Sequence, residues 1–224
     1  MFASSRLIRE VERSAEICTV PATGGTPQRV MDAFGVRPVP SADGRYIAYV
    51  ERNCRFAREA YTGPANRSIY VYDKQNNAYT AVADTDAQES NPAWDNQGNL
   101  YYLSAANGRY NIYRQKVGGT AEALTKFKDE GIREFTVSAD GCRIVFERAN
   151  GLFLMASDGR SKVQRLDIEV TADYRFDPIE QKTLSRSATE MAVSPNGDHL
   201  LFGVRGELFL KVNDKEKELT SYTE

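Results

Sequence analysis

Four polar residues recur at one place in a repeated sequence pattern, and they are the chain's candidates for binding chemistry. They are Arg37, Asn91, Glu134 and Glu190. Each stands seven residues before a glycine, and these glycines are Gly44, Gly98, Gly141 and Gly197. A guanidinium group, an amide and two carboxylates can contact a peptide or a sugar through directed hydrogen bonds. Polar side chains also line any water-filled channel, so this plainer interpretation stays open.

The elements that position these residues are read from the repeat. Its copies are VRPVPSADGRYIAY, SNPAWDNQGNLYYL, REFTVSADGCRIVF and TEMAVSPNGDHLLF, with turn glycines 54, 43 and 56 residues apart. A second pattern follows each copy, as SIYVYD, NIYRQK, LFLMAS and LFLKVN, and EICTVP is a further copy upstream. A period in the forties that is built from short strands predicts a β-propeller.

The repeat with the fewest insertions, residues 90–124, predicts the layout of one blade. Short predicted strands at 91–94, 100–103, 111–116 and 121–124 are separated by turns at Gly98, Asn107-Gly108 and Gly118-Gly119. Glycine supplies the positive φ that tight hairpins need. We therefore expect an all-β protein whose blades each contain four antiparallel strands.

Apolar positions predict which strand faces are buried. Six and four residues before the turn glycine, the innermost strand presents Pro38, Pro92, Phe135 and Met191, then Pro40, Trp94, Val137 and Val193. Three and five residues after it, the next strand presents Ile47, Tyr101, Ile144 and Leu200, then Tyr49, Leu103, Phe146 and Phe202. This period of two predicts buried faces that neighbouring blades cover. The four polar candidates stand on the opposite face of the innermost strands, where they would face the channel.

The chain is expected to hold about four and a half blades. We assign a partial blade to residues 1–33 and complete blades to about 34–86, 87–129, 130–170 and 188–221. Two loops are inserted, at 53–67 and 169–187. The first has the composition of a surface loop, open to a helical turn at about 54–61. The second enters an innermost strand beside the channel, so it is the better candidate for contact with a ligand or partner, although an elaborated loop without function stays open.

Composition and single residues exclude several functions. The net charge of −2 gives no basic field for nucleic acid, and no apolar stretch approaches the roughly 20 residues that span a membrane. Cys18, Cys54 and Cys142 are scattered, without metal-ligand spacing, and no motif indicates a metal or cofactor. His199 is the only histidine and no nucleophile motif accompanies it, so no catalytic residue is predicted.

The quoted residues resemble a known family. The turn pattern, the IYVYD-like strand and the blade endings Gly118 to Thr125 and Lys215 to Thr220 resemble the WD40-like repeat of TolB and tricorn-type propellers. The segment 188–211 is similar to later blades of the six-bladed N-terminal propeller of tricorn-like serine peptidases. That family has an acidic residue before its AVSPDG turn and an RGE before the third strand, which match Glu190 and Arg205-Gly206-Glu207 here.

This resemblance implies a non-catalytic propeller segment that guides or filters peptides for a protease domain outside the chain. Peptidase and PDZ domains of the same parent protein would then be its partners, and the parent would be a serine protease. A TolB-like module that binds a protein partner is the alternative, and a glycosidase with paired channel carboxylates is a weaker one. No targeting segment is visible; the segment as given slightly favours the cytoplasm, and the periplasm stays open if a signal peptide was removed.

Counting strands predicts an open arc of a six-bladed ring. The first blade lacks its innermost strand and the last ends at residue 221, so about one further blade would be needed for closure. A five-bladed closure is the alternative. In an arc, the end faces would be apolar and unpaired, which predicts self-association through them.

Overall fold

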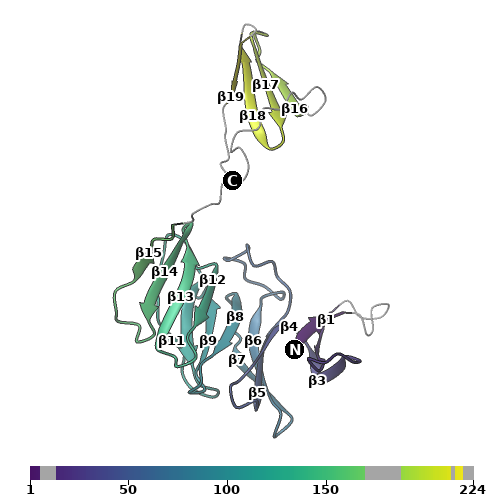
Figure 1. The fold of residues 1–224 in the computed structure, drawn as a ribbon, viewed down its shortest axis with the longest axis vertical. Coiled ribbons are helices and arrows are strands. Elements are labelled where there is room, and N and C mark those ends of the chain that lie inside the picture. Colours follow the sequence, from purple (N-terminus) through teal and green to yellow (C-terminus); the bar gives the residue numbers. More distant parts are fainter. Residues whose placement is uncertain (6–13, 170–187, 213–214, 219–224) are drawn as a thin grey trace. The chain divides into compact units, whose positions relative to one another are not determined.

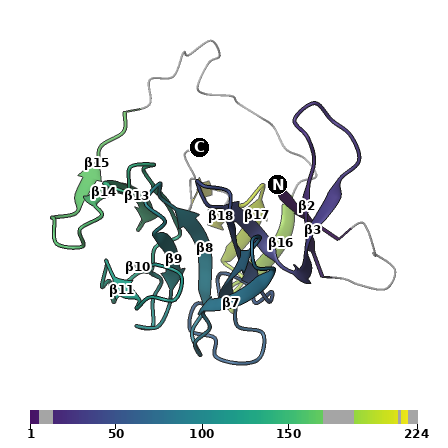
Figure 2. The ribbon, with the colours of Figure 1, turned by 90° about the horizontal axis from the view of Figure 1, so that it is seen from below.

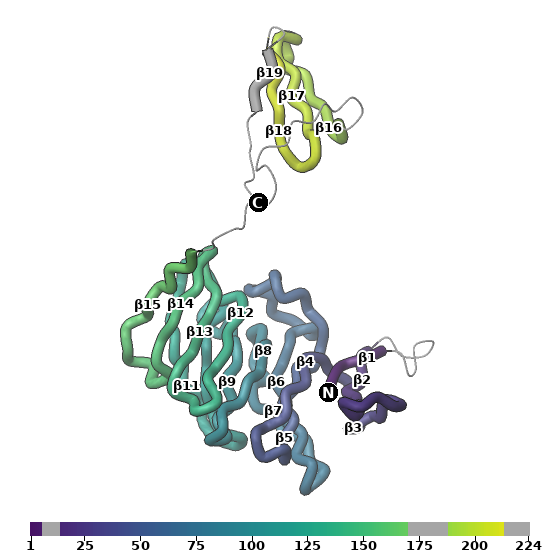
Figure 3. The backbone as a smooth tube through the Cα atoms, viewed as in Figure 1, coloured from purple at the N-terminus to yellow at the C-terminus, as the bar shows by residue number. Residues whose placement is uncertain are grey.

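The protein is all-β. A computed structural model describes residues 1–5, 14–169, 188–212 and 215–218, and every regular element among them is a strand. The chain divides into two compact units, Met1–Glu169 and Val170–Glu224, each described by itself (Figures 1 and 3). Among the described residues, no helix is long and apolar enough to cross a membrane.

The first unit contains four antiparallel sheets. The first has three strands, β1 (Phe2–Ser4), β2 (Glu16–Thr19) and β3 (Gln28–Phe34). The second contains β4 (Val36–Pro40), β5 (Tyr46–Glu51), β6 (Ser68–Asp73) and β7 (Ala78–Ala83). The third contains β8 (Glu89–Trp94), β9 (Leu100–Ser104), β10 (Asn111–Gln115) and β11 (Glu122–Ala123). The fourth contains β12 (Glu134–Val137), β13 (Arg143–Arg148), β14 (Gly151–Ala156) and β15 (Gln164–Leu166).

The second unit contains one described sheet, made of β16 (Ala188–Val193), β17 (His199–Val204), β18 (Glu207–Val212) and β19 (Lys215–Glu218). Each four-stranded sheet pairs its strands in sequence order, as hairpin connections require. This confirms the prediction of four-stranded antiparallel blades. In the first unit the sheets follow one another in chain order, as Figures 1 and 2 show.

A repeated turn explains the Ser-x-Asp/Asn-Gly pattern. All four turn glycines have a φ between 70° and 76°, and each donates its N–H to the carbonyl three residues earlier. In the third copy, the Ser138 hydroxyl donates to Asp140 at 2.5 Å and accepts the N–H of Arg143 at 2.9 Å. Equivalent serine hydrogen bonds form in the first and last copies. The turn therefore uses glycine for its backbone and, in three copies, serine for its closure. In the second copy Asp95 Oδ1 accepts the N–H groups of Gln97 and Asn99 instead.

The core lies between neighbouring sheets. One cluster joins Leu103 and Ile112 of the β8–β11 sheet to Phe135 and Phe146 of the β12–β15 sheet. A second joins the β4–β7 sheet to β9, and a third joins β2 and β3 to β5. The predicted middle-strand positions Ile47, Tyr101, Ile144, Tyr49, Leu103 and Phe146 are all buried, which confirms that assignment for the first unit. The sheets of the first unit thus bury faces against their neighbours, as a repeat architecture requires.

The predicted burial of the innermost strands is only partly right. Phe135 and Pro92 are buried, but Pro40 is exposed, and Met191 and Val193 are 71% and 59% exposed. The pairing register shifts in β4, β8 and β16, and one extra residue reverses the in-and-out alternation of a strand. For Met191 and Val193 there is a second reason, since no other sheet is described in their unit.

Trp94 connects two blades. Its indole ring stacks on Tyr46 with centroids 6.1 Å apart, and its Nε1 donates to the Val39 carbonyl at 3.1 Å. The side chain is half-buried. Strand β8 is thereby attached to β4 and β5 of the preceding blade.

Candidate functional site

Three of the four predicted polar residues meet in the structure. Glu134 Oε1 accepts a hydrogen bond from Asn91 Nδ2 at 2.6 Å, and Glu134 Oε2 lies 3.4 Å from Arg37 Nη1. We call this trio the inner-strand cluster. Its members come from β4, β8 and β12, the first strands of three successive blades, and β8 lies next to both of the others. Because the Arg37 and Glu134 side chains are 48% and 54% exposed, the cluster is open to solvent.

Two members of the cluster have unusual backbone conformations. Arg37 has φ 53° and Asn91 has φ 55°, both in the left-handed region, and both lie within the register shifts of β4 and β8. Asparagine tolerates this region, but arginine rarely adopts it. A bulge re-aims a side chain and is frequent at functional sites. In β12 the register is regular through Glu134. Two members of the cluster are therefore positioned by bulges and the third by a regular strand.

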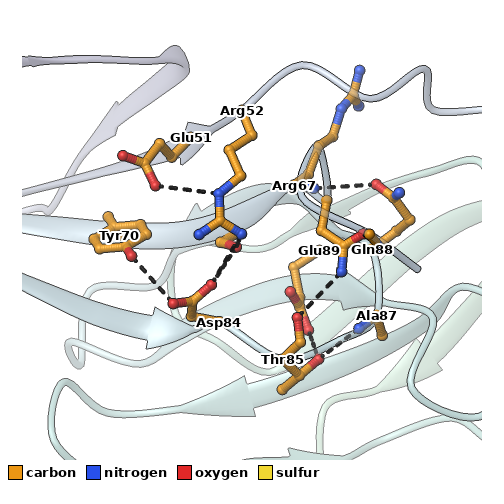
Figure 4. Close-up of polar contacts among 12 residues, drawn as sticks. Glu51, Arg52, Arg67, Tyr70, Asp84, Thr85, Ala87, Gln88 and Glu89 are labelled. Atoms are coloured by element: carbon orange, nitrogen blue, oxygen red, sulfur yellow. Dashed lines mark hydrogen bonds and ion pairs between the residues drawn. The ribbon is translucent and has the colours of Figure 1, made fainter. Parts of the chain in front are cut away.

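A hydrogen-bond chain orients Asn91. Arg67 Nη1 donates to Ser90 Oγ at 3.3 Å, and Ser90 Oγ donates to Asn91 Oδ1 at 2.8 Å. With its oxygen accepting from Ser90, the Asn91 amide directs its NH₂ group toward Glu134. Burial lowers the pKa of Arg67. The backbone N–H of Arg67 is itself bonded to Gln88 Oε1 at 3.3 Å, as Figure 4 shows.

Glu89 directly precedes Ser90 of this hydrogen-bond chain, and its carboxyl group is buried. It is fully buried, and its Oε1 accepts a hydrogen bond from Thr85 Oγ1 at 2.5 Å (Figure 4). The same oxygen accepts from Ser104 Oγ at 3.4 Å. No hydrogen-bond partner is described for Oε2. Burial, aided by the charge of Asp84, raises the pKa of Glu89 to about 7. Sequence analysis missed this residue, because an acidic residue at a strand start gives no signal that it will be buried.

Asp84 is used structurally. Its Oδ1 lies 3.4 Å from Arg52 Nη1, and its Oδ2 accepts from Tyr70 at 3.2 Å (Figure 4). Oδ1 also accepts from Ser68 at 2.7 Å. These groups leave the carboxylate satisfied by protein donors. Over the described part of the chain, no group of three or more His, Cys, Asp or Glu side chains could hold a metal ion.

A pocket adjoins the inner-strand cluster. Its volume is about 750 Å³, and Arg37 and Glu134 contribute to its lining. The inserted loop 53–67 contributes Phe56, Ala57 and Glu59, and the connection between the second and third complete blades contributes residues 129–133. We call this space the loop pocket. Its size is within the range of small-ligand sites.

The loop 53–67 is fastened to the following blade. The Phe56 ring stacks on Tyr110 with centroids 4.4 Å apart, and the Tyr110 hydroxyl donates to the Phe56 carbonyl at 3.2 Å. The Glu59 carboxylate accepts the Tyr110 backbone N–H and lies 3.3 Å from Arg109 Nη1. Two successive turns form at 55–61 in place of the helical turn that the composition left open. Sequence analysis favoured the other insertion, whose residues 170–187 lie outside the described part of the chain.

Glu190 and His199, which the sequence analysis also considered, belong to the second unit, and the three cysteines belong to the first. Glu190 lies on β16 in the second unit, where it is exposed and pairs with Gly203 across the sheet. His199 begins β17, and its backbone N–H donates to Ser194 Oγ at 3.0 Å. The cysteines are free thiols, with Cys18 and Cys54 buried and Cys142 exposed.

The successive four-stranded sheets, with their cores between blades and polar residues on their first strands, define a β-propeller. The chain belongs to the family of tricorn protease N-terminal β-propeller domains, whose sequence profile matches residues 1–161. No curated protein sequence matches it.

Solved structures show the same fold. The crystal structure of the tricorn protease aligns with 93% of this chain at 17% identity and a TM-score of 0.62, and the chain covers 20% of that protein. A putative TolB from Agrobacterium tumefaciens aligns with 73% at 20% identity and a TM-score of 0.58, and 58% of it is covered. TolB from Acinetobacter baumannii aligns with 91% at 19% identity and a TM-score of 0.52, and 47% of it is covered.

Proposed function

We propose that this chain is a non-catalytic propeller segment that binds extended peptides and guides them toward a peptidase domain of the same parent protein. Membership of the tricorn N-terminal propeller family supports this role. The inner-strand cluster is the observation that carries it, because it joins a guanidinium group, an amide and a carboxylate across three neighbouring blades.

The chemistry of the cluster suits the backbone of a peptide. The guanidinium of Arg37 donates to peptide carbonyl groups, and the carboxylate of Glu134 accepts from peptide N–H groups. Asn91 is buried and holds the Glu134 carboxylate through its amide. Every peptide carries these groups whatever its sequence. Since Arg37 and Glu134 are half-exposed, a passing chain can reach them without unfolding of the blades. The cluster therefore binds and orients, and bond cleavage belongs to another domain.

Peptide titration tests this function. We expect a capped, uncharged, fluorescently labelled peptide to bind the chain, and the double variant Arg37→Ala/Glu134→Ala to bind it about five- to tenfold more weakly. The matched control is Arg114→Ala/Glu122→Ala, which removes a different arginine–glutamate pair, on β10 and β11, and should leave the affinity unchanged. Equal affinity in the first variant and the control contradicts the proposal. Binding of a folded protein partner without peptide binding favours the TolB-like alternative.

A further inference from the structure

The charges of the loop pocket are unbalanced. Five carboxylates line it against three guanidinium groups. Each guanidinium is already in an ion pair, and these pairs are Arg37–Glu134 at 3.4 Å, Arg109–Glu59 at 3.3 Å and Arg133–Glu147 at 3.7 Å. Asp129 is paired with Arg148, from outside the lining. Glu130 is exposed, and no ion pair is described for its carboxylate. The lining therefore has a carboxylate that can bind a cation, and all of its guanidinium groups are already paired.

The wall beneath this acidic rim is apolar. Ile132 is fully buried, Tyr110 is 2% exposed, and the Phe56 ring stacks on Tyr110.

We propose that the loop pocket binds a cationic side chain, lysine or arginine, of the guided peptide. This inference rests on the proposed function. Both side chains have an aliphatic stem and a charged head, and such side chains bury the stem while the head stays at a polar rim. Here the stem lies against the partly exposed Phe56, and the head lies at the rim near the exposed Glu130. Because Arg37 and Glu134 belong to both sites, a peptide held at the inner-strand cluster can place one side chain in the pocket.

An acidic side chain fits less well. A carboxylate would need a donor, and every lining guanidinium already has a carboxylate partner that would compete for it. It would also enter a lining whose carboxylates outnumber its guanidinium groups by two, which costs affinity through like-charge repulsion.

Matched peptides test the charge preference with the full chain. Four capped peptides share one uncharged sequence and differ at the central residue, which is arginine, its uncharged isostere citrulline, lysine or its uncharged analogue norleucine. We expect the arginine and lysine peptides to bind about tenfold more tightly than their uncharged counterparts. A fifth peptide with a central glutamate should bind more weakly than the citrulline peptide.

Three variants place the preference in the pocket. Ala57→Trp fills the space from an exposed position and should reduce the arginine-to-citrulline preference to less than about twofold. Glu130→Gln should reduce it about threefold. The control Asp86→Asn neutralises an exposed carboxylate outside the lining and should leave the arginine-to-citrulline preference unchanged. Equal affinity for arginine and citrulline peptides, tighter binding of the glutamate peptide, or a preference that survives Ala57→Trp would overturn the inference. If the citrulline peptide binds in each case, the proposed function stands; if no peptide binds, the proposed function itself has failed.

Discussion

At the residue scale, two carboxyl groups, those of Glu89 and Glu59, are hydrogen-bonded to residues of other segments. Glu89 is buried with two hydroxyl donors on one oxygen, and Glu59 is held against a backbone N–H of the next blade. Both carboxyls lie beside the residues that we assign to peptide binding. Because hydrogen bonds hold each carboxyl group in place, a change at either group should alter the free energy of unfolding.

Glu89 should make the folded state less stable as pH rises. Burial raises its pKa from an ordinary 4.5 to about 7, so between these values the folded chain binds a proton that the unfolded chain releases. The stability of the natural chain should therefore fall relative to Glu89→Gln from pH 4.5 to 7, by at most about 3 kcal/mol, and stay constant above pH 7. Urea unfolding, followed by circular dichroism at several pH values, measures this. Parallel stability curves for the two proteins would contradict the buried, protonated carboxyl.

Replacing Gly131 with any residue that has a side chain should lower the free energy of unfolding. A Cβ there would meet the Glu59 carboxylate and lie 2.9 Å from the backbone nitrogen of Tyr110. We expect Gly131→Ala to cost about 1–3 kcal/mol, because the loop 53–67 must move away from the blade. In a Glu59→Ala background the cost should shrink, and a double-mutant cycle of urea unfolding measures this coupling. A cost that is the same in both backgrounds would show that the loop is not held in this way.

At the scale of elements, single side chains connect neighbouring blades. Trp94 links β8 to the preceding blade, and Phe56 links the loop 53–67 to the following one. Since no blade buries its faces alone, these connections position the first strands on which the inner-strand cluster lies.

Removing the Trp94 ring should weaken the connection between β8 and β4. We expect Trp94→Ala to lower the free energy of unfolding by about 2–4 kcal/mol, below the full cost of a buried tryptophan because the ring is half-buried. Trp94→Phe keeps the stacking on Tyr46 and loses the hydrogen bond to Val39, so it should cost about 0.5–1.5 kcal/mol. Far-ultraviolet circular dichroism during urea unfolding gives both values. A loss under about 1 kcal/mol for the alanine variant would contradict the contact.

The repeat predicted the strands well because its signal is local. A period of two on either side of a turn glycine identifies the middle strands, and Ile144 and Phe146 are buried as expected. The same alignment placed Arg37, Asn91 and Glu134 at equivalent positions, where their shared location on three strands allows them to meet. Of the two bulges, the sequence indicated only the one at Asn91, because asparagine tolerates positive φ. Nothing in the sequence indicated the bulge at Arg37.

The loop pocket could not be predicted in this way. It depends on contacts between residues far apart in sequence, such as Phe56 with Tyr110 and Glu59 with Gly131. The charges and turn residues of 53–67 are also typical of a solvated loop, so composition alone gave no reason to place it against another blade. Gly131 was the one available hint, since a glycine outside a turn often marks close approach of another segment.

At the scale of the whole molecule, apolar side chains on β16 lead us to propose self-association. Met191 and Val193 are 71% and 59% exposed, whereas their counterparts Phe135 and Val137 in the first unit are more buried. We expect sedimentation velocity to show association that increases with concentration, and Met191→Ser/Val193→Ser to weaken it. The control Ile168→Ser removes another exposed apolar side chain, outside β16, and should leave association unchanged. A monomer at every concentration would contradict the proposal.

The most direct test of peptide guidance is to find where a peptide lies on the propeller. A capped, uncharged peptide that carries a benzophenone side chain can be photo-crosslinked to the full chain, and the labelled residues identified by mass spectrometry. Our account predicts labels on the first strands β4, β8 and β12 around Arg37, Asn91 and Glu134, and on the adjoining loop residues Phe56 and Ala57. Labels confined to the last strands of the blades, β7, β11 and β15, would contradict it.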